Sequence, residues 1–530
     1  MYGRNAFGNP DGSRTDIEDM MQEFVIFERK YFSSGVASPD DLKTRVIVGP
    51  KGAGKTVYLR RMRANLLLNP SIFANSIEHE VPPSDLVIKF SQSFNSELIT
   101  EKWSLAWKYA ILRSVISNIL FNSTWNTNVS NEQKDILKSY YNKLYPKFRR
   151  PMNVYSELKD IIFEHGSRNR FYNYSNLHQW AEVEAVVAEI MKELPPIYYF
   201  IDSVDDEYAH APMYWMRCQK GLFYRVMRFT REETYGNKLH VIISIRDNVF
   251  SSVCLSEHHT RYINEEHIRI LNWDYTTIAY FFKNKISKLD EEYFINEGER
   301  SLYNWLNRKT INNRARNITE PLELYILRHT RLLPRDVVVL GNSLAEIKQK
   351  YSSNPSLDID ALVRTKVSEC STDFGNELLT ICANQINNNE MPHDAGIKDY
   401  SGVYTSIKEY EHSTMSNLKK LIIELGKDRF TSEDITRVNK KADEVLGENH
   451  SFFDVLWQNG AVGYLEEDPN GKREIFFNTV NPEFLLPDNK KTYLLRSCII
   501  DSVGMELIKY DTVPVIGGYK TWEDISDGLL

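Results

Sequence analysis

The sequence lacks the cysteine patterns of disulfide-rich and zinc-binding proteins. Its five cysteines are scattered along 530 residues, their number is odd, and no two of them form a CxxC pair. This arrangement excludes a disulfide framework and the paired ligand spacing of a zinc site. We therefore expect a protein of the reducing cytoplasm.

Long apolar runs are also missing. No stretch approaches the roughly 18 consecutive apolar residues that a membrane-spanning helix requires. Residues 1–16 contain no apolar centre of the kind that a secretory signal peptide has. We expect no association with a membrane.

An excess of positive charge is the third feature that the sequence lacks. The 65 lysines and arginines face 72 aspartates and glutamates, so the net charge is −7 at pH 7. This balance disfavours non-specific coating of nucleic acid, although it leaves a local basic patch open. Hydrophobic residues at 42% and charged residues at 26% are typical of a folded globular chain, and the length allows two to four domains.

A phosphate-binding loop follows the first apolar strand of the sequence. Val46–Val48 is a short apolar run typical of a buried parallel strand. Residues 49–56 read GPKGAGKT and match G-x-x-x-x-G-K-[ST] at every fixed position, and helix-forming residues come next. Strand, glycine loop and helix therefore occur in the order that the motif requires.

The chemistry of phosphate binding explains these residue types. Glycines at 49, 52 and 54 let the backbone turn tightly and direct N–H groups at phosphate oxygens. Lys55 would reach the β- and γ-phosphates, and the Thr56 hydroxyl would bind Mg²⁺. The predicted nucleotide-binding residues of the loop are Gly49, Pro50, Lys51, Gly52, Ala53, Gly54, Lys55, Thr56 and Val57.

Acidic residues follow a second apolar strand, Ile197–Ile201. Asp202 comes directly after it, and a carboxylate at the end of a buried strand is costly unless it faces an ion or a donor. Beside a phosphate-binding loop that ion is Mg²⁺. Asp205 and Asp206 lie one turn further on and are candidates to orient or deprotonate the attacking water. An ordinary solvated acidic turn is the alternative.

A third strand is predicted at Leu239–Ile245 and ends next to Arg246. An arginine at the carboxyl end of a parallel strand points into the crevice where α/β folds bind ligands. Arg246 could therefore sense the γ-phosphate or stabilise developing charge. An ion pair with Asp247 or Asp202 is the alternative for the same side chain.

These motifs carry a resemblance to a known group of ATPases. Tyr198–Asp206 (YYFIDSVDD) resembles the Walker B segment of NACHT and other STAND ATPases, and Ile243–Asn248 (ISIRDN) resembles their sensor strand. Ile270–Ile286 is similar to the I-x-W segment of bacterial KAP-like ATPases. Arg331–Leu344 resembles the P-R-D helix start of AAA+-type lids.

The resemblance identifies the chain as a P-loop ATPase of the STAND, KAP and AAA+-like (ASCE) group, of a bacterial regulatory or antiviral-defence type. It implies ATP and Mg²⁺ as ligands and Arg335 as the second sensor. The sequence departs from the pattern in two places. Lys283 and Lys285 stand where an arginine usually precedes the final Ile, and Asp206 replaces the commoner final Glu.

The predicted fold is α/β, with a parallel five-stranded P-loop core. The five expected strands are Arg45–Val48, Asp85–Phe90, Ile197–Ile201, Leu239–Ile245 and His267–Leu271. The expected domains are a core at 1–288 with a helical insertion at about 95–190, a helical lid at 289–351, a linker and helical segment at 352–412, a winged-helix-like domain at 413–486 and a tail at 487–530.

The winged-helix prediction depends on three helices followed by a hairpin. The helices are expected at Met415–Gly426, Ser432–Leu446 and Ser451–Asn459, and GAVGYLEE and REIFFN flank a turn at Asp468–Gly471. The third helix, where a DNA reader would carry cations, has no lysine or arginine. Packing against a partner protein or against the chain's own ATPase core is therefore favoured over contact with DNA.

Two weaker signals leave alternatives open. Cys254, His258 and His259 invite a metal interpretation, but a second ligand pair is missing, and a loop is favoured. Arg225, Arg228 and Arg231 lie three residues apart on one predicted helix. They could supply an arginine finger to a neighbouring subunit, or they could form an exposed basic stripe.

The preferred function is an ATP-hydrolysing regulatory ATPase that couples its nucleotide state to a separate effector protein. We expect it to form homo-oligomers. The first alternative is a motor or loader ATPase that acts on nucleic acid. The second is a nucleotide-dependent scaffold with little turnover.

Overall fold

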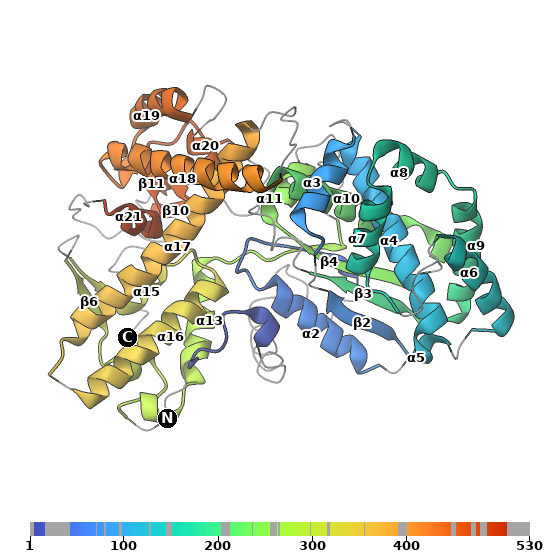
Figure 1. Ribbon diagram of the computed structural model, residues 1–530. Coiled ribbons are helices and arrows are strands. Elements are labelled where there is room, and N and C mark those ends of the chain that lie inside the picture. The colour runs from blue at the N-terminus through green and yellow to red at the C-terminus, as the bar shows by residue number, and fades with distance from the viewer. Residues whose placement is uncertain are drawn as a thin grey trace. The chain divides into compact units, whose positions relative to one another are not determined.

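We describe the protein from a computed structural model (Figure 1). The described residues are 5–15, 43–69, 71–78, 81–94, 98–126, 129–144, 151–202, 212–235, 237–254, 262, 265–296, 298–314, 318–354, 356–390, 400–446, 452–467, 473–477 and 485–505. They form two compact units. The core unit comprises the described residues of 43–51 and 55–271, and the C-terminal unit comprises those of 5–15, 52–54 and 272–505.

A parallel sheet of five strands forms the centre of the core unit. Its strands are β1 (Val46–Val48), β2 (Phe73–Glu78), β3 (Ile197–Ile201), β4 (Leu239–Ile245) and β5 (Ile268–Ile270), in the order β2-β3-β4-β1-β5. Every pairing between neighbours is parallel. The residues of β1 and β3 are buried throughout, as expected for strands covered on both faces. The predicted α/β fold with a five-stranded parallel sheet is therefore confirmed, and its order is consistent with a P-loop-like core.

One of the five predicted strands is wrong. Asp85–Phe90 lies within helix α3 (Ser84–Gln92), and the second strand is Phe73–Glu78 instead. Val87 and Phe90 lie three residues apart and are both fully buried, which is the periodicity of a helix face. A short apolar run does not distinguish the two states. β2 pairs only with β3 at the sheet edge, and its Asn and Ser are poor strand formers.

The long connection between β2 and β3 is helical, as predicted. Its helices are α3, α4 (Ile99–Phe121), α5 (Ser123–Asn126), α6 (Asn131–Leu144), α7 (Val154–His165), α8 (Arg168–Ser175) and α9 (Gln179–Glu193). Helix α4 is buried along most of its length and packs against α10 (Pro212–Arg231). The remaining helical elements of the unit are α2 (Lys55–Leu67), η4 (Glu233–Tyr235) and α11 (Asp247–Cys254).

The C-terminal unit contains helices and two antiparallel sheets. Its elements before residue 400 are η1 (Gly12–Arg14), α13 (Tyr275–Ser287), η5 (Glu291–Tyr293), α14 (Leu302–Leu306), β6 (Thr310–Asn313), β7 (Ile318–Pro321), α15 (Leu322–Arg328), α16 (Pro334–Ser353) and α17 (Ile359–Glu390). The expectation that 289–351 is helical therefore misses the antiparallel pair β6–β7. Helix α16 also extends into the first residues of the predicted linker.

The last part of this unit contains the predicted three helices and hairpin. Its elements are α18 (Tyr400–Leu425), β8 (Arg429–Phe430), α19 (Ser432–Leu446), α20 (Phe452–Gln458), β9 (Val462–Glu467), β10 (Arg473–Phe477), β11 (Thr492–Leu495) and α21 (Ser497–Val503). The sequence did not predict β8 and β11, which complete an antiparallel sheet of order β10-β9-β11-β8. Within the described residues, none of the helices is long and apolar enough to cross a lipid bilayer.

Residues 5–15 pack onto the C-terminal unit through Phe7. This side chain is 1% exposed and lies against the rings of Phe282 and Trp305. Asn342 accepts a hydrogen bond from the Phe7 amide at 2.7 Å and donates to the Gly8 carbonyl at 3.0 Å. The N-terminal segment is thus held by both packing and hydrogen bonds.

The contact between α10 and α4 yields a prediction at Gly221. A Cβ atom added there would lie 2.4 Å from Trp103 Cβ and 2.8 Å from the Ser104 amide nitrogen. We expect Gly221→Ala to lower the free energy of unfolding by about 1–3 kcal/mol, because overpacking outweighs the better helix propensity of alanine. Urea unfolding measures this change.

A matched control is Arg228→Ala on the same helix, where the side chain is 65% exposed. This substitution should change the free energy of unfolding by less than about 0.5 kcal/mol. A Gly221→Ala variant as stable as the unchanged protein would contradict the close approach of α10 and α4.

Candidate functional site

The glycine loop connects β1 to α2 in the conformation that its motif predicts. Gly49 directly follows β1, and its amide donates to the Ile245 carbonyl of β4 at 3.3 Å. Gly52 and Gly54 both have φ of +93°, a region that residues with a Cβ rarely adopt. Glycine is therefore required at these two positions by the backbone itself.

Lys55 is the first residue of α2 and is 7% exposed. Its Nζ donates to the Gly49 carbonyl at 2.9 Å and to the Pro50 carbonyl at 3.2 Å. These two bonds hold the ammonium group over the loop. Thr56 and Val57 follow in the first turn of α2 and are partly buried. The N–H groups of a first helical turn have no partner within the helix and suit an anion.

Asp202 follows β3 directly and is 1% exposed. Its carboxylate accepts a hydrogen bond from the Ser244 hydroxyl of β4. Its amide donates to the Glu78 carbonyl at 3.1 Å, and its own carbonyl accepts from the Tyr155 hydroxyl at 2.7 Å. The backbone of Asp202 is thus held on both sides.

The strand order brings Asp202 and the glycine loop to the same edge of the sheet. Strand β4 pairs with β1 on one side and with β3 on the other, all parallel. The carboxyl ends of the three strands therefore meet at one edge. Oxygen ligands such as the Thr56 hydroxyl and the Asp202 carboxylate are the type that Mg²⁺ prefers.

Arg246 follows β4 and is 7% exposed, which places it at the carboxyl edge that the sequence predicted. Its amide donates to Gln219 Oε1 at 3.4 Å. Burial raises the pKa of the neighbouring Asp247 carboxyl, while the charges of Lys55 and Arg246 act in the opposite direction. Asp247 therefore lies within electrostatic reach of both cations, and it was considered from the sequence only as an ion-pair partner of Arg246.

Arg335 and Trp273 contact the tip of the glycine loop within the C-terminal unit, to which residues 52–54 belong. The Arg335 amide lies 3.3 Å from the Gly52 carbonyl, and Arg335 Cβ lies 3.2 Å from the position of a Cβ built on Gly52. Trp273 Nε1 donates to the Ala53 carbonyl at 2.9 Å. A larger residue at position 52 would therefore meet both backbone strain and Arg335.

Several predicted residues fall outside the described residues. Asp205 and Asp206 lie in the segment 203–211, and His258 and His259 lie in 255–261. Cys254 is the last residue of α11 and is 1% exposed. In the part of the chain that the structure describes, no group of three or more His, Cys, Asp or Glu side chains could hold a metal ion.

The three arginines of α10 have different environments. Arg225 is 2% exposed, and its Nε donates to the Ser104 carbonyl of α4 at 3.1 Å. Arg231 pairs with Glu265 at 2.6 Å. Arg228 pairs with Glu232 at 3.6 Å but keeps a 65% exposed side chain. The interpretation of all three as one exposed stripe is therefore wrong for Arg225, which the packing of α10 against α4 covers.

Glu78 is a buried acid that the sequence analysis missed. It ends β2, is 4% exposed, and accepts from the Val154 amide at 2.9 Å and the Tyr155 amide at 3.0 Å. Burial raises its pKa to about 7, although these two hydrogen bonds act the other way. Glu78 thus caps α7 and, through its carbonyl, holds Asp202. It was missed together with β2, which has no clear strand signal.

The comparisons with known proteins identify no family. A scan against protein-family models gives no match, and a search of curated proteins finds no similar sequence. Interpretation of the site therefore depends on its own residues and geometry.

The raised pKa of Glu78 predicts a pH-dependent stability. An unfolded glutamate releases its proton near pH 4.3, whereas Glu78 holds it to about pH 7 in the folded chain. The stabilisation from this group is full below pH 4.3 and is lost as pH rises from there through 7, by up to about 4 kcal/mol. Glu78→Gln stays neutral and avoids this loss.

Urea unfolding at pH 5 and pH 8 tests this prediction. The free energy of unfolding of the unchanged protein should fall relative to that of Glu78→Gln between the two pH values. The exposed control Glu189→Gln, whose side chain is 70% exposed, should follow the unchanged protein. A difference between Glu78→Gln and the unchanged protein that is the same at both pH values would rule out the raised pKa.

Proposed function

We propose that this chain is a Mg²⁺-dependent P-loop ATPase of the STAND and AAA+-like (ASCE) type. The observation that carries the proposal is the arrangement of three neighbouring strands. β1 ends in the glycine loop, β3 ends in Asp202, and β4 between them ends in Arg246. Phosphate, metal and charge-stabilising groups are thereby brought to one edge of one sheet.

Each residue has a distinct proposed role. The loop amides bind the phosphates, and Lys55 exchanges its bonds to Gly49 and Pro50 for phosphate oxygens. Thr56 and Asp202 hold Mg²⁺, whose charge would offset that of the phosphates when bound. Ser244 donates to Asp202 and so fixes the orientation of its carboxylate.

Hydrolysis requires one group that orients or deprotonates the attacking water and another that stabilises the charge developing on the γ-phosphoryl group. Asp205 and Asp206 remain the proposed groups for water activation, on the sequence alone. Arg246 is proposed to stabilise charge on the γ-phosphoryl group because it ends the strand between β1 and β3. Arg335 is proposed as a second sensor, supported by its position at the start of α16 beside Gly52.

The last elements of the C-terminal unit are proposed to form a winged-helix-like module, and we propose that it transmits the nucleotide state to a separate effector protein. Helices α18, α19 and α20 precede the β9–β10 hairpin, and β11 pairs with both β9 and β8. In a winged helix α20 would be the recognition helix, yet Phe452, Phe453 and Leu456 on it are at most 2% exposed. A buried helix without cations disfavours the motor or loader alternative.

Lys55→Ala tests the nucleotide site directly. We expect loss of ATP binding by at least tenfold and loss of measurable hydrolysis, because Lys55 is the lysine that the motif directs to the β- and γ-phosphates. Lys192→Ala on α9 is the matched control, since its side chain is 57% exposed and lies outside the glycine loop. Binding and turnover are measured by calorimetry and phosphate release. An Lys55→Ala variant as active as the unchanged protein would refute the site assignment.

Arg228 tests whether a neighbouring subunit completes the site. The proposed homo-oligomer places an exposed arginine of α10 against the nucleotide of the adjacent copy, and of the three candidates only Arg228 is mainly exposed. Arg228→Ala should lower turnover by 10³-fold or more at unchanged ATP affinity, as loss of a finger in trans does. Arg437→Ala on α19, whose side chain is 46% exposed, should not.

Mixing experiments then separate action in trans from action within one chain. The unchanged protein is mixed with Arg228→Ala in varying proportions. If Arg228 acts in trans, the specific activity of the mixture is not proportional to its fraction of unchanged protein. Strict proportionality at concentrations on both sides of assembly would remove the finger and leave Arg246 as the charge-stabilising arginine.

A further inference from the structure

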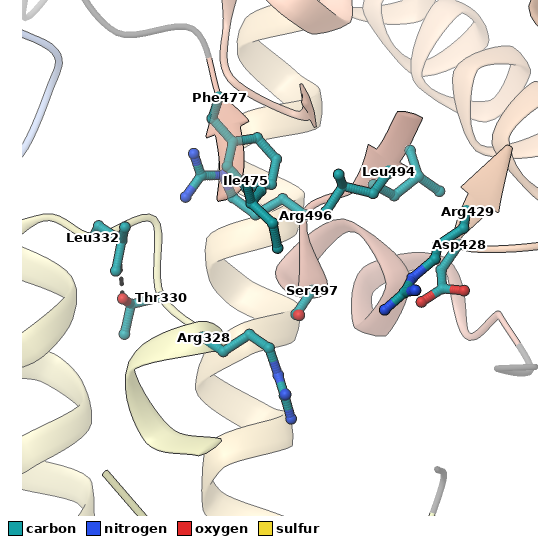
Figure 2. A pocket seen from close by; sticks show the side chains of 11 residues that line it. Arg328, Thr330, Leu332, Asp428, Arg429, Ile475, Phe477, Leu494, Arg496 and Ser497 are labelled. Atoms are coloured by element: carbon teal, nitrogen blue, oxygen red, sulfur yellow. Dashed lines mark hydrogen bonds between the residues drawn. The ribbon is translucent and has the colours of Figure 1, made fainter. Parts of the chain in front are cut away.

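A hollow in the C-terminal unit lies where the antiparallel sheet meets the end of α15 (Figure 2). It encloses about 30 Å³, roughly twice the space that one water molecule requires. Its walls come from the turn after α15, the start of β8, the end of β10 and the junction of β11 with α21. The lining residues are Arg328, Thr330, Leu332, Asp428, Arg429, Ile475, Phe477, Leu494, Leu495, Arg496 and Ser497.

Arg496 is a buried cation that no carboxylate of the described residues pairs with at ion-pair distance. Its side chain donates from Nε to the Gly460 carbonyl at 2.7 Å, and its guanidinium lies 4.0 Å from the centre of the Phe477 ring. Burial lowers the pKa of Arg496 to about 10, Cys498 and Asp336 act in the opposite direction, and the charge of Arg331 adds to the lowering. Arg496 is therefore charged at pH 7, and an anion in the hollow would stabilise that charge.

Arg328 contributes a second incompletely bonded guanidinium. Its Nη2 bonds to the Glu320 carboxylate, but its Nη1 is buried and has no hydrogen-bond partner among the described residues. Figure 2 shows Arg328 below Ser497 with its guanidinium directed away from Arg496, whose own guanidinium lies beside Phe477. Glu320 therefore offsets the charge of Arg328, and Arg328 contributes an unsatisfied N–H donor to the lining beside the charge of Arg496.

The charge of the lining as a whole is positive. Three arginines line the hollow against one acidic side chain, Asp428, and the remaining walls are apolar apart from the hydroxyls of Thr330 and Ser497. Guanidinium groups beside apolar walls favour anions because the low dielectric strengthens the attraction. The lining thus selects for an oxyanion over a neutral or cationic group.

Backbone strain at Leu332 is an independent sign of a functional position. Leu332 has φ of +58°, which is unfavourable for a leucine, and its amide does not donate to the carbonyl of a strand or helix. It donates instead to the Thr330 hydroxyl at 3.1 Å, the dashed line in Figure 2. A backbone conformation strained in this way is kept only where the surrounding structure enforces it, and such residues are frequent at ligand sites.

We propose that this hollow binds the phosphate group of a small phosphorylated molecule. A phosphate offers oxygens in several directions and so suits arginines that approach from separate elements, whereas a carboxylate offers two oxygens in one plane. The enclosed space takes only the anionic group, so the rest of the ligand extends from the mouth. This site consists of residues of the C-terminal unit and is separate from the glycine loop.

Calorimetric titration with pyrophosphate tests the proposal. The glycine loop would also bind pyrophosphate, so the titration uses a Lys55→Ala background. We expect one site to remain, with binding weakened at least tenfold by Arg496→Gln and unaffected by Arg437→Gln, an exposed arginine of the same unit. No binding in the Lys55→Ala background, or equal binding after Arg496→Gln, would overturn the proposal.

Two further arms keep the test decisive. If Arg496→Gln does not fold, Arg429→Gln, whose side chain is only partly buried, replaces it with the same expectation. Hydrogen exchange should show slower amide exchange at 328–332 and 494–497 when pyrophosphate is added to the Lys55→Ala protein. A single-stranded oligonucleotide that binds through Arg496 where pyrophosphate does not would overturn the assignment to a small ligand.

Discussion

Parallel pairing of β4 with both β1 and β3 is the constraint on which the candidate site depends. Val48 of β1 lies level with Ile245 of β4, so the glycine loop begins where Arg246 follows its own strand. Ile201 of β3 lies level with Ile243, so Asp202 comes beside Ser244. The strand register alone therefore brings the glycine loop, Asp202 and Arg246 to the same edge of the sheet.

The same strand register places several ionisable groups at one buried edge of the sheet. Each of these groups forms hydrogen bonds with nearby residues. Lys55 bonds to the loop carbonyls, Asp202 accepts from Ser244, and Glu78 accepts from the first amides of α7. Buried ionisable groups are costly unless they are hydrogen-bonded or face an ion. Asp247 lies beside the same cations, and burial raises its pKa. Such a concentration of perturbed and hydrogen-bonded groups is typical of functional sites.

The residues that the sequence predicted correctly are those whose local pattern decides their structure. Val46–Val48 and Ile197–Ile201 are continuous apolar runs, as strands covered on both faces require. Positions 52 and 54 have positive φ values, which glycine adopts without strain. The helices α19 and α20 and the β9–β10 hairpin follow from periodicity and a turn in the same way. In these places local propensity and tertiary packing agree.

The features that were missed depend on partners distant in the sequence. Strand β2 is set by its pairing with β3, because its own residues are poor strand formers. β8 and β11 are short strands, and both depend on tertiary pairing: β11 pairs with β8 on one side and with β9 on the other. Arg225 looked exposed from its spacing, yet α4 covers it, and Gly221 marks how closely the two helices approach. Glu78 became a candidate only once the ends of β2 and α7 were seen together.

The central claim is that this edge of the sheet holds a nucleoside triphosphate with a divalent ion. Calorimetric titration of the unchanged protein with a slowly hydrolysed ATP analogue, with and without Mg²⁺, tests it most directly. We expect one site per chain and an affinity that falls at least tenfold when Mg²⁺ is removed, because Thr56 and Asp202 then lose their shared ligand. Absence of binding in both titrations, or binding that is indifferent to Mg²⁺, would contradict it.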